Sequence, residues 1–340
     1  MKYSIIDISS SSLSMIVAEI DGAKAEIVFK DRVPLFLFPH FDGKNLSEHG
    51  LNKLTGELKE FQQKCAQFHA ERCYVISTAA LRLIENFNEV QKTVEEKLGL
   101  PVNFLDGATE AYCDLAANAY YQTYERAVLV DLGGKSIEIC DFSKNAKEEM
   151  AYLDFGLLDL NRKFVKKLQP DENEAKEIKK YIKGRFDEAG IPKKGAFSTV
   201  VLVGATNCAV YDVYADYAKC SREEESKIID RKTFKNLTKN LLVGADRSSL
   251  ILNNAPEKLF LIGPAAIVLR NLFKRFDADN IVVSERGVKE GYLQLILDGK
   301  ESGRYYDFTS DRICGGEKKR RGRPKKTADT EGNKKGVSKR

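Results

Sequence analysis

The sequence predicts a duplicated α/β protein whose two halves repeat one order of elements. Apolar runs of strand length alternate with amphipathic stretches of helical length over residues 3–120, and the alternation returns over residues 126–297. Each half contains three successive strands and then alternating helices and strands, in the order βββαβαβα. Two copies of one plan predict two lobes with a ligand cleft between them. The length of 340 residues, 43% of them hydrophobic and 31% charged, suits about two globular domains.

The first predicted lobe covers residues 1–122. Asp21-Gly22 marks a turn between its second and third strands, Gly99 ends its second helix, and Pro101 restarts the chain. Its last helix carries Glu110. The predicted strands are residues 3–8, 13–20, 25–33, 73–77 and 102–105, and the earlier predicted helices are residues 46–68 and 88–98.

The second predicted lobe covers residues 123–300 and repeats this order. Gly204 separates its fourth strand from the helix that follows. The predicted strands are residues 127–131, 136–140, 149–153, 199–203 and 281–284, and the other predicted helices are residues 158–168, 172–189, 232–243, 256–275 and 287–297.

Cysteine usage and hydropathy indicate the compartment. The seven cysteines are odd in number, scattered and never in a Cys-x-x-Cys pair, which favours reduced thiols in a cytoplasmic protein and argues against a zinc ribbon. Asp7 and Glu19 interrupt the apolar N-terminal region, and no stretch approaches 18 apolar residues. We therefore expect neither export nor a membrane span.

The strongest local motif lies between the first two strands of the second half. A buried strand ends in Asp131, and Gly133-Gly134 permit a tight turn whose backbone N–H groups can converge on an anion. Alternation then places Ser136 and Glu138 on one face of the next strand, which can carry phosphate and metal. For this hairpin alone, an ordinary turn is an equally good interpretation.

The first half carries a counterpart at the equivalent place. A strand containing Asp7 leads into a small-residue hairpin in which serines replace the glycines, at Ser9, Ser10, Ser11 and Ser12. Taken alone, Asp7 also suits a turn anchored by local hydrogen bonds. Two such motifs at equivalent places in a duplicated plan favour a shared phosphate site.

These motifs resemble the exopolyphosphatase and guanosine pentaphosphate phosphohydrolase family, in the superfamily of sugar kinases, actin and the large heat-shock chaperones. The resemblance runs from about residue 3 to 297 and implies actin-like lobes of the ribonuclease H-like type. The segments that carry it are residues 7–12, 77–82 with Asn86, 107–111, 131–138, Gly156, 204–206 and 284–291.

The resemblance implies roles for individual residues. Glu110 corresponds to the acid that activates water, and Asp131 and Glu138 correspond to the carboxylates that bind Mg²⁺. Hydrolysis of a phosphoanhydride requires such a positioned water, a carboxylate beside it and positive charge on the phosphate oxygens. Asp7 is a further candidate for orienting metal or water. The expected phosphate-binding residues are Ser9, Ser10, Ser11, Ser12, Arg82, Gly133, Gly134, Lys135, Ser136, Gly204 and Thr206.

Other interpretations of these residues stay open. An acid in the first turn of a helix, such as Glu110, favourably meets the helix dipole whatever its function, and Arg82 alone suits a surface ion pair. Ser9, Lys135 and Ala205 stand where the family has glycine, and Ile137 replaces a Thr. A Cβ where the backbone needs positive φ costs energy or reshapes the loop. Either Lys135 adds a cation beside the substrate or the turn is degraded, and we expect a retained but modified site.

The last segment, residues 301–340, lacks apolar periodicity and is predicted to be a disordered tail. Residues 317–340 hold 11 basic and 3 acidic side chains, whereas residues 1–316 hold 44 and 47. Arg321-Gly322-Arg323-Pro324 resembles an AT-hook, whose arginines enter a narrow A·T minor groove. A nonspecific polycation that binds any polyanion is an equally good interpretation.

The expected function is Mg²⁺-dependent hydrolysis of the terminal phosphoanhydride of polyphosphate or of guanosine pentaphosphate. Two alternatives stay open: a kinase of the same superfamily, and a noncatalytic polyphosphate or nucleotide sensor that addresses DNA through its tail. A homodimer is one of the assembly states that the sequence leaves open.

Overall fold

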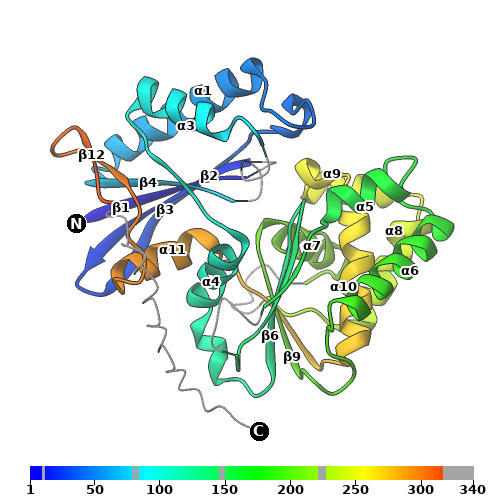
Figure 1. Cartoon of the computed structure of the whole chain (residues 1–340). Helices are drawn as coiled ribbons and strands as arrows, with labels where there is room; N and C mark the ends of the chain where they lie inside the picture. Colours follow the sequence, from blue (N-terminus) through cyan, green and yellow to red (C-terminus); the bar gives the residue numbers. More distant parts are fainter. Residues whose placement is uncertain (10–11, 79–80, 82–83, 145–149, 221–226, 317–340) are drawn as a thin grey trace, which may run out of the picture.

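The structure is a computed structural model that describes residues 1–9, 12–78, 81, 84–144, 150–220 and 227–316 (Figure 1). It contains two lobes, each built on a mixed β-sheet. The strands in chain order are β1 (Lys2–Ile8), β2 (Ser12–Asp21), β3 (Lys24–Pro34), β4 (Arg72–Ser77), β5 (Val102–Phe104), β6 (Ala127–Leu132), β7 (Ile137–Asp141), β8 (Ala151–Leu153), β9 (Thr199–Val203), β10 (Asn280–Val283), β11 (Tyr305–Asp307) and β12 (Arg312–Cys314).

The helices fill the predicted places between the strands. They are α1 (Glu48–Gln67), α3 (Phe87–Leu98), α4 (Gly107–Ala117), α5 (Leu157–Phe164), α6 (Glu172–Glu188), α7 (Ala205–Ala218), α8 (Arg231–Val243), α9 (Arg247–Asn254), α10 (Ile262–Phe276) and α11 (Val288–Leu297), with short 3-10 turns η1 (Phe38–His40), η2 (Ala119–Thr123) and η3 (Pro256–Lys258). The predicted helix 256–275 is therefore divided, because the chain from Pro256 forms a 3-10 turn before α10 begins, and α9 was not predicted.

The two sheets repeat one topology, which confirms the predicted duplication. In the first sheet the order is β3, β2, β1, β4, β5, and in the second it is β8, β7, β6, β9, β10. In both sheets the first two strand pairs are antiparallel and the last two are parallel. This shared plan brings the ends of β1 and β6, where the two predicted phosphate hairpins begin, to equivalent places in the two lobes.

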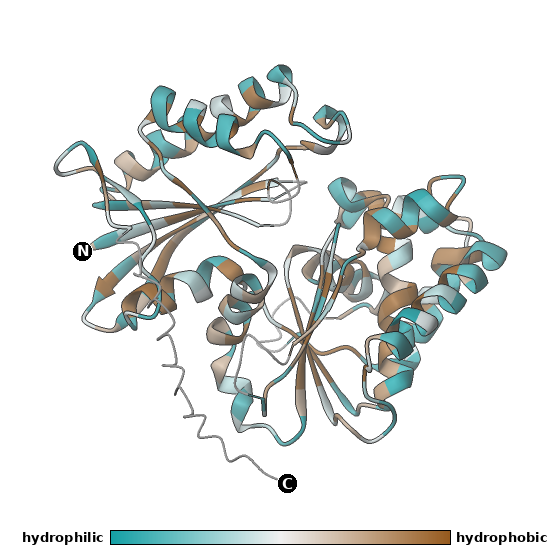
Figure 2. Ribbon diagram, viewed as in Figure 1, coloured by the Kyte–Doolittle hydropathy of each residue, from teal (hydrophilic) through white to brown (hydrophobic). Residues whose placement is uncertain are grey.

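Local sequence explains where the helices start and which side they bury. Ser47 accepts a hydrogen bond from the backbone N–H of Gly50 at the start of α1. Asp171 and Glu174 form a reciprocal capping box at the start of α6. Apolar residues at helical spacing then face the sheets. Figure 2 shows that the strands are largely hydrophobic and that the helices covering them have hydrophilic outer sides.

The last helix of each half packs against the sheet of the other lobe. In α4, Ala111 and Leu115 pack with Leu129 of β6, whereas in α11, Tyr292 and Leu293 pack against the first sheet. The two helices touch at Gly291, where a Cβ would lie 2.8 Å from the Cα of Cys113. The second lobe was expected to cover residues 123–300. In the structure, α11 lies within that range but packs in the core of the first lobe.

The expectation of a disordered tail from residue 301 is wrong for residues 305–314. These residues form a hairpin whose strand β11 pairs antiparallel with β4. The guanidinium of Arg72 lies 4.9 Å from the ring centroid of Tyr305, and the Asn103 side chain exchanges two hydrogen bonds with the backbone of Arg304. Such nonlocal contacts leave no periodic pattern in the sequence. The AT-hook-like motif at Arg321–Pro324 lies outside the described residues.

Two smaller expectations can be compared directly with the structure. All seven cysteines lie within the described ranges, and none is disulfide-bonded. No helix in the described part of the chain is long and apolar enough to cross a membrane.

Candidate active site

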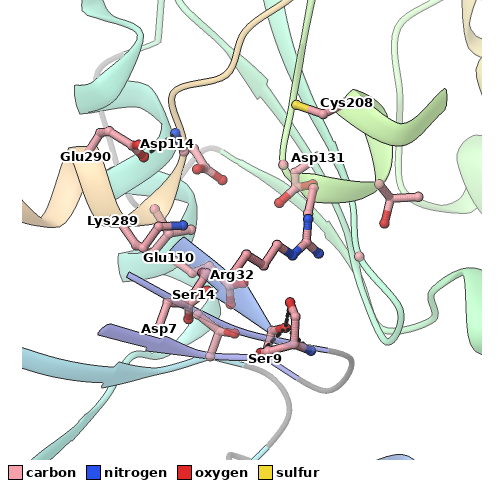
Figure 3. Close-up of a pocket in the computed structure, with 18 of the residues that line it drawn as sticks. Asp7, Ser9, Ser14, Arg32, Glu110, Asp114, Asp131, Cys208, Lys289 and Glu290 are labelled. Carbon is pink, nitrogen blue, oxygen red and sulfur yellow. Dashed lines mark hydrogen bonds between the residues drawn. The ribbon is translucent and has the colours of Figure 1, made fainter. Parts of the chain in front are cut away.

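A cavity of about 540 Å³ lies between the lobes and is lined by both of them. The first lobe contributes Ser9 and Ser12 from its hairpin, and the second contributes the turn after β6. Glu110 and Asp131, which are predicted as catalytic and metal-binding residues, both line it (Figure 3). The fold therefore places these two carboxylates, from elements far apart in sequence, at one solvent-filled space.

The second-lobe hairpin carries a pair of carboxylates across its two strands. Asp131 of β6 lies opposite Glu138 of β7 in the antiparallel register, so the two side chains share one face of the sheet. Glu138 is 2% exposed and is not among the described residues that line the cavity. Asp131 lines the cavity directly, while Glu138 is buried beside it on the same face of the sheet.

The turn of this hairpin is held by the start of α5. The N–H of Gly133 donates to the carbonyl of Ser136 at 2.9 Å, and the carbonyls of Gly133 and Gly134 accept from the first backbone N–H groups of α5. Any Cβ at Gly156 would collide with the backbone of Gly134. A glycine at position 156 is thus required for the turn to pack on α5.

Lys135 lines the cavity and is also ion-paired. Its ammonium lies 2.8 Å from Asp159, whose other carboxylate oxygen accepts the N–H of Gly156. The side chain that replaces a family glycine therefore helps to fix the turn. Ser9, Lys135 and Ala205 all avoid positive φ, so the strain expected from a Cβ at these three positions is absent.

The first-lobe hairpin is held by hydroxyl groups. The Ser9 hydroxyl donates to the Ser12 carbonyl at 2.9 Å and accepts the Ser12 N–H at 3.1 Å. The Ser9 side chain thus helps to close this hairpin turn, whereas glycines form the equivalent turn in the other lobe. Ser10 and Ser11 lie outside the described residues, and so does Arg82.

Gly204, unlike Ser9, Lys135 and Ala205, has a positive φ. Its φ is +84° and its ψ is 159°, a region that essentially only glycine adopts. A Cβ here would lie 2.8 Å from Cγ and 2.9 Å from Oδ2 of Asp131. The adjoining Thr206 is buried and also lines the cavity. Gly204 therefore makes the space in which the Asp131 carboxylate sits.

Glu110 owes its position to the start of α4. Asp106 caps this helix by accepting the N–H of Thr109 at 2.7 Å. Glu110 follows in the first turn and is 9% exposed, and Gly107 leaves room for the ring of Tyr152 from the second lobe. The helix thus begins where the lobes meet, and its first turn carries the acid into the cavity.

Asp114, one helical turn after Glu110, is a lining residue that the sequence analysis missed. It is 1% exposed, and both of its carboxylate oxygens are buried without a hydrogen-bond partner in the described part of the chain. Burial, together with the nearby carboxylates of Asp131 and Glu110, raises its pKa well above the usual range. The spacing of four residues to Glu110 was the available signal, since residues four apart share a helix face.

Four basic residues that were not predicted also line the cavity: Lys30 and Arg32 of β3, Lys258 of η3 and Lys289 of α11. Lys258 is 3% exposed, and burial next to Arg32 lowers its pKa to about 8. Figure 3 shows the Arg32 side chain extending toward Asp131. No local sequence pattern indicates these basic residues, because each belongs to an element whose position depends on the fold.

The carboxylates at the cavity suit a divalent cation. Mg²⁺ takes one or two carboxylates and completes its shell with water and phosphate oxygens. No group of three or more His, Cys, Asp or Glu within the described ranges forms a complete metal site. The pair of Asp131 and Glu138 offers oxygen ligands, and burial raises the pKa of Asp131 and of Asp7. Asp7 Oδ1 is buried without a hydrogen-bond partner among the described residues, as expected of a group that a cation or water would satisfy.

Comparison with known proteins identifies the family. The model of the Ppx/GppA phosphatase family matches residues 16–299. The chain belongs to this family. The match confirms the resemblance drawn from the motifs and covers most of both lobes.

Solved structures of the Ppx/GppA family share the fold. The family member from Aquifex aeolicus has a TM-score of 0.72 at 21% identity, over 89% of this chain and 99% of that one. An exopolyphosphatase from Cytophaga hutchinsonii has a TM-score of 0.75 at 17% identity, over 88% and 99%.

Two curated relatives match this chain over part of their length. It is 25% identical over 320 residues to a bifunctional 3-dehydroquinate synthase/phosphatase of Fusobacterium nucleatum, covering 87% of this chain and 46% of that protein. It is 24% identical over 168 residues to an uncharacterised Streptomyces coelicolor protein, covering 48% and 50%. The chain thus spans about half the length of the curated relatives it matches.

Proposed function

We propose that this chain is a phosphohydrolase that removes the terminal phosphate of inorganic polyphosphate, with guanosine pentaphosphate as the alternative substrate, and that it requires Mg²⁺. The observation that carries the proposal is the meeting of Glu110 of α4 and Asp131 of β6 at one cavity that both hairpins line. Family membership and the exopolyphosphatase among the structural neighbours support the same reaction class.

In the proposed reaction Glu110 orients a water molecule and accepts its proton. The water oxygen forms a bond to the terminal phosphorus while the bond to the bridging oxygen breaks, and the shortened chain leaves with that oxygen. Glu110 suits this part because it is largely buried yet lines the cavity. A positioned general base contributes about 10²–10⁴-fold to such a step.

The other residues bind the phosphates. Arg32, Lys258 and Lys289 supply positive charge from three separate elements, and the two hairpins supply polar groups. Asp131 and Glu138 would hold Mg²⁺, which when bound neutralises charge that develops on the phosphate oxygens. Ser10, Ser11 and Arg82 remain proposed phosphate contacts from the sequence alone.

We propose polyphosphate rather than guanosine pentaphosphate as the main substrate because of the side chains that line the cavity. The described residues that line the cavity include no aromatic side chain, so a base would find no stacking partner there. Binding of DNA or another polyanion by Arg321–Pro324, a homodimer and a cytoplasmic location also remain proposals.

Phosphate release tests the function. Full-length protein is incubated separately with polyphosphate and guanosine pentaphosphate, with Mg²⁺ and with chelator, as wild type and as Glu110→Gln. We expect Mg²⁺-dependent release that Glu110→Gln lowers about 10²–10⁴-fold. Glu89→Gln is the matched control, because Glu89 is also an acid in the first turn of a first-lobe helix but lies exposed on α3.

Two results would count against the proposal. Equal release by wild type and Glu110→Gln would remove Glu110 from the reaction. Tight polyphosphate binding without turnover under any divalent metal would instead favour the sensor.

A further inference from the structure

Asp114 has a buried carboxyl group that none of the described residues hydrogen-bonds. It is on α4, 1% exposed, and lines the cavity, yet neither carboxylate oxygen has a hydrogen-bond partner within the described ranges. Figure 3 shows Asp114 facing the same open space as Asp131. Burying a carboxylate without a partner is strongly unfavourable. A group of this kind is expected to have a partner that arrives from solution.

The charges around Asp114 point to the sign of that partner. The carboxylates of Glu110, Asp131 and Glu290 line the same cavity as Asp114, and Glu138 lies opposite Asp131 in the register of β6 with β7. Carboxylates gathered at one place repel one another unless a cation lies among them. The described neighbours therefore favour a cation at this place.

The helix crossing fixes Asp114 in position. The Asn118 side chain donates to the Asp114 carbonyl at 2.8 Å and to the Arg286 carbonyl at 3.1 Å, which ties α4 to the segment before α11. Across this junction, a Cβ at Gly287 would lie 3.6 Å from Asp114 Oδ1. The backbone beneath the carboxylate is thus held rigidly, while its oxygens are left to the cavity.

We propose that Asp114 and Asp131 hold a second divalent cation, Mg²⁺ or Mn²⁺, beside the ion assigned to Asp131 and Glu138. Two carboxylates leave most of the coordination shell to water and to phosphate oxygens. Two cations that share one carboxylate form the kind of clamp that stabilises both oxygens of a phosphoryl displacement. The inference rests on the proposed function, but its test does not use turnover.

The test counts cations bound to the full-length protein. Mn²⁺ is titrated without substrate and bound ions are counted by electron paramagnetic resonance, in wild type, Asp114→Asn and Asp298→Asn. We expect two sites in wild type and a loss of at least about tenfold in affinity at one site in Asp114→Asn. Asp298→Asn is the matched control, since Asp298 follows α11 at its far end, away from the cavity, and should keep both sites.

Thermal denaturation separates a cation ligand from a structural role. Without metal, Asp114→Asn should unfold at about the wild-type temperature or above it, because the buried carboxyl group that it replaces has no hydrogen-bond partner among the described residues. Added Mn²⁺ should raise the wild-type midpoint more than that of the variant, since only the wild type binds both ions. Equal Mn²⁺ stoichiometry and affinity in wild type and Asp114→Asn would overturn the inference. If Asp114→Asn loses a cation while wild type hydrolyses no phosphoanhydride, the cation site stands and the proposed function fails.

Discussion

Substitution of Gly204 tests how strictly the fold positions Asp131. In Gly204→Ala the new methyl group would lie 2.8 Å from Asp131 Cγ, whereas carbon atoms normally approach to about 3.5–4.0 Å. Asp131 must therefore move by about 1 Å. The backbone at φ +84° and ψ 159° adds a cost of about 1–3 kcal/mol for any residue with a Cβ.

The displacement of Asp131 predicts a loss of activity, and the backbone strain at Gly204 predicts a loss of stability. A misplacement of about 1 Å in a reacting group can lower the rate by about 10²-fold, equivalent to about 2.7 kcal/mol in the activation free energy. We expect Gly204→Ala to lower kcat/KM for polyphosphate by about this factor. We also expect its free energy of unfolding to fall by about 1–3 kcal/mol.

Gly195→Ala separates backbone strain from displacement of Asp131. Gly195 has a nearly identical φ of +82°, but no described atom lies within 4 Å of its would-be Cβ. Gly195→Ala should therefore also lose stability because of its positive φ, and it should keep its kcat/KM. Phosphate release and denaturant unfolding are measured on both variants. If Gly204→Ala, folded as judged by unfolding, retains activity within about threefold of Gly195→Ala, the reasoning about Asp131 is wrong.

Two further predictions concern pH and the C-terminal hairpin. Because burial lowers the pKa of Lys258 to about 8, a rise in pH from 7 to 9.5 removes its positive charge. KM for polyphosphate should then rise about tenfold, and much less in Lys258→Arg, which stays charged; a flat wild-type KM would contradict this role. A chain ending at residue 300 loses β11 and the contacts of Tyr305 and Arg304, so its free energy of unfolding should fall by at least about 2 kcal/mol. A chain ending at residue 316 should match wild type, and equal stability of the two truncations would contradict the role of the hairpin.

Local patterns in the sequence were sufficient for most elements and for part of the site. Strand alternation predicted that Ser136 and Glu138 share one face of the second strand of the hairpin, and the register of β6 with β7 sets Asp131 opposite Glu138. The helix carrying Glu110 starts where its capping residue Asp106 stands. These features depend on the chain within a few residues, since caps, turns and alternation are local. The order of elements, repeated twice, was enough to predict two lobes.

Contacts between segments distant in the sequence decided the features that local patterns did not predict. Which sheet α4 and α11 cover follows from their mutual packing at Gly291, which no periodicity encodes. The short strand β11 forms because Arg72 and Cys73 of β4 offer an edge that β5 does not pair with.

The same holds for the lining of the cavity. An aspartate at position 114 is compatible with an exposed helix face, and it becomes a buried, unpartnered carboxylate because the second lobe and α11 close over that face. The sequence by itself thus determined the elements and the motifs at their ends, because these need only neighbouring residues. The tertiary structure decided which charges share one cavity, because that depends on how the two lobes pack.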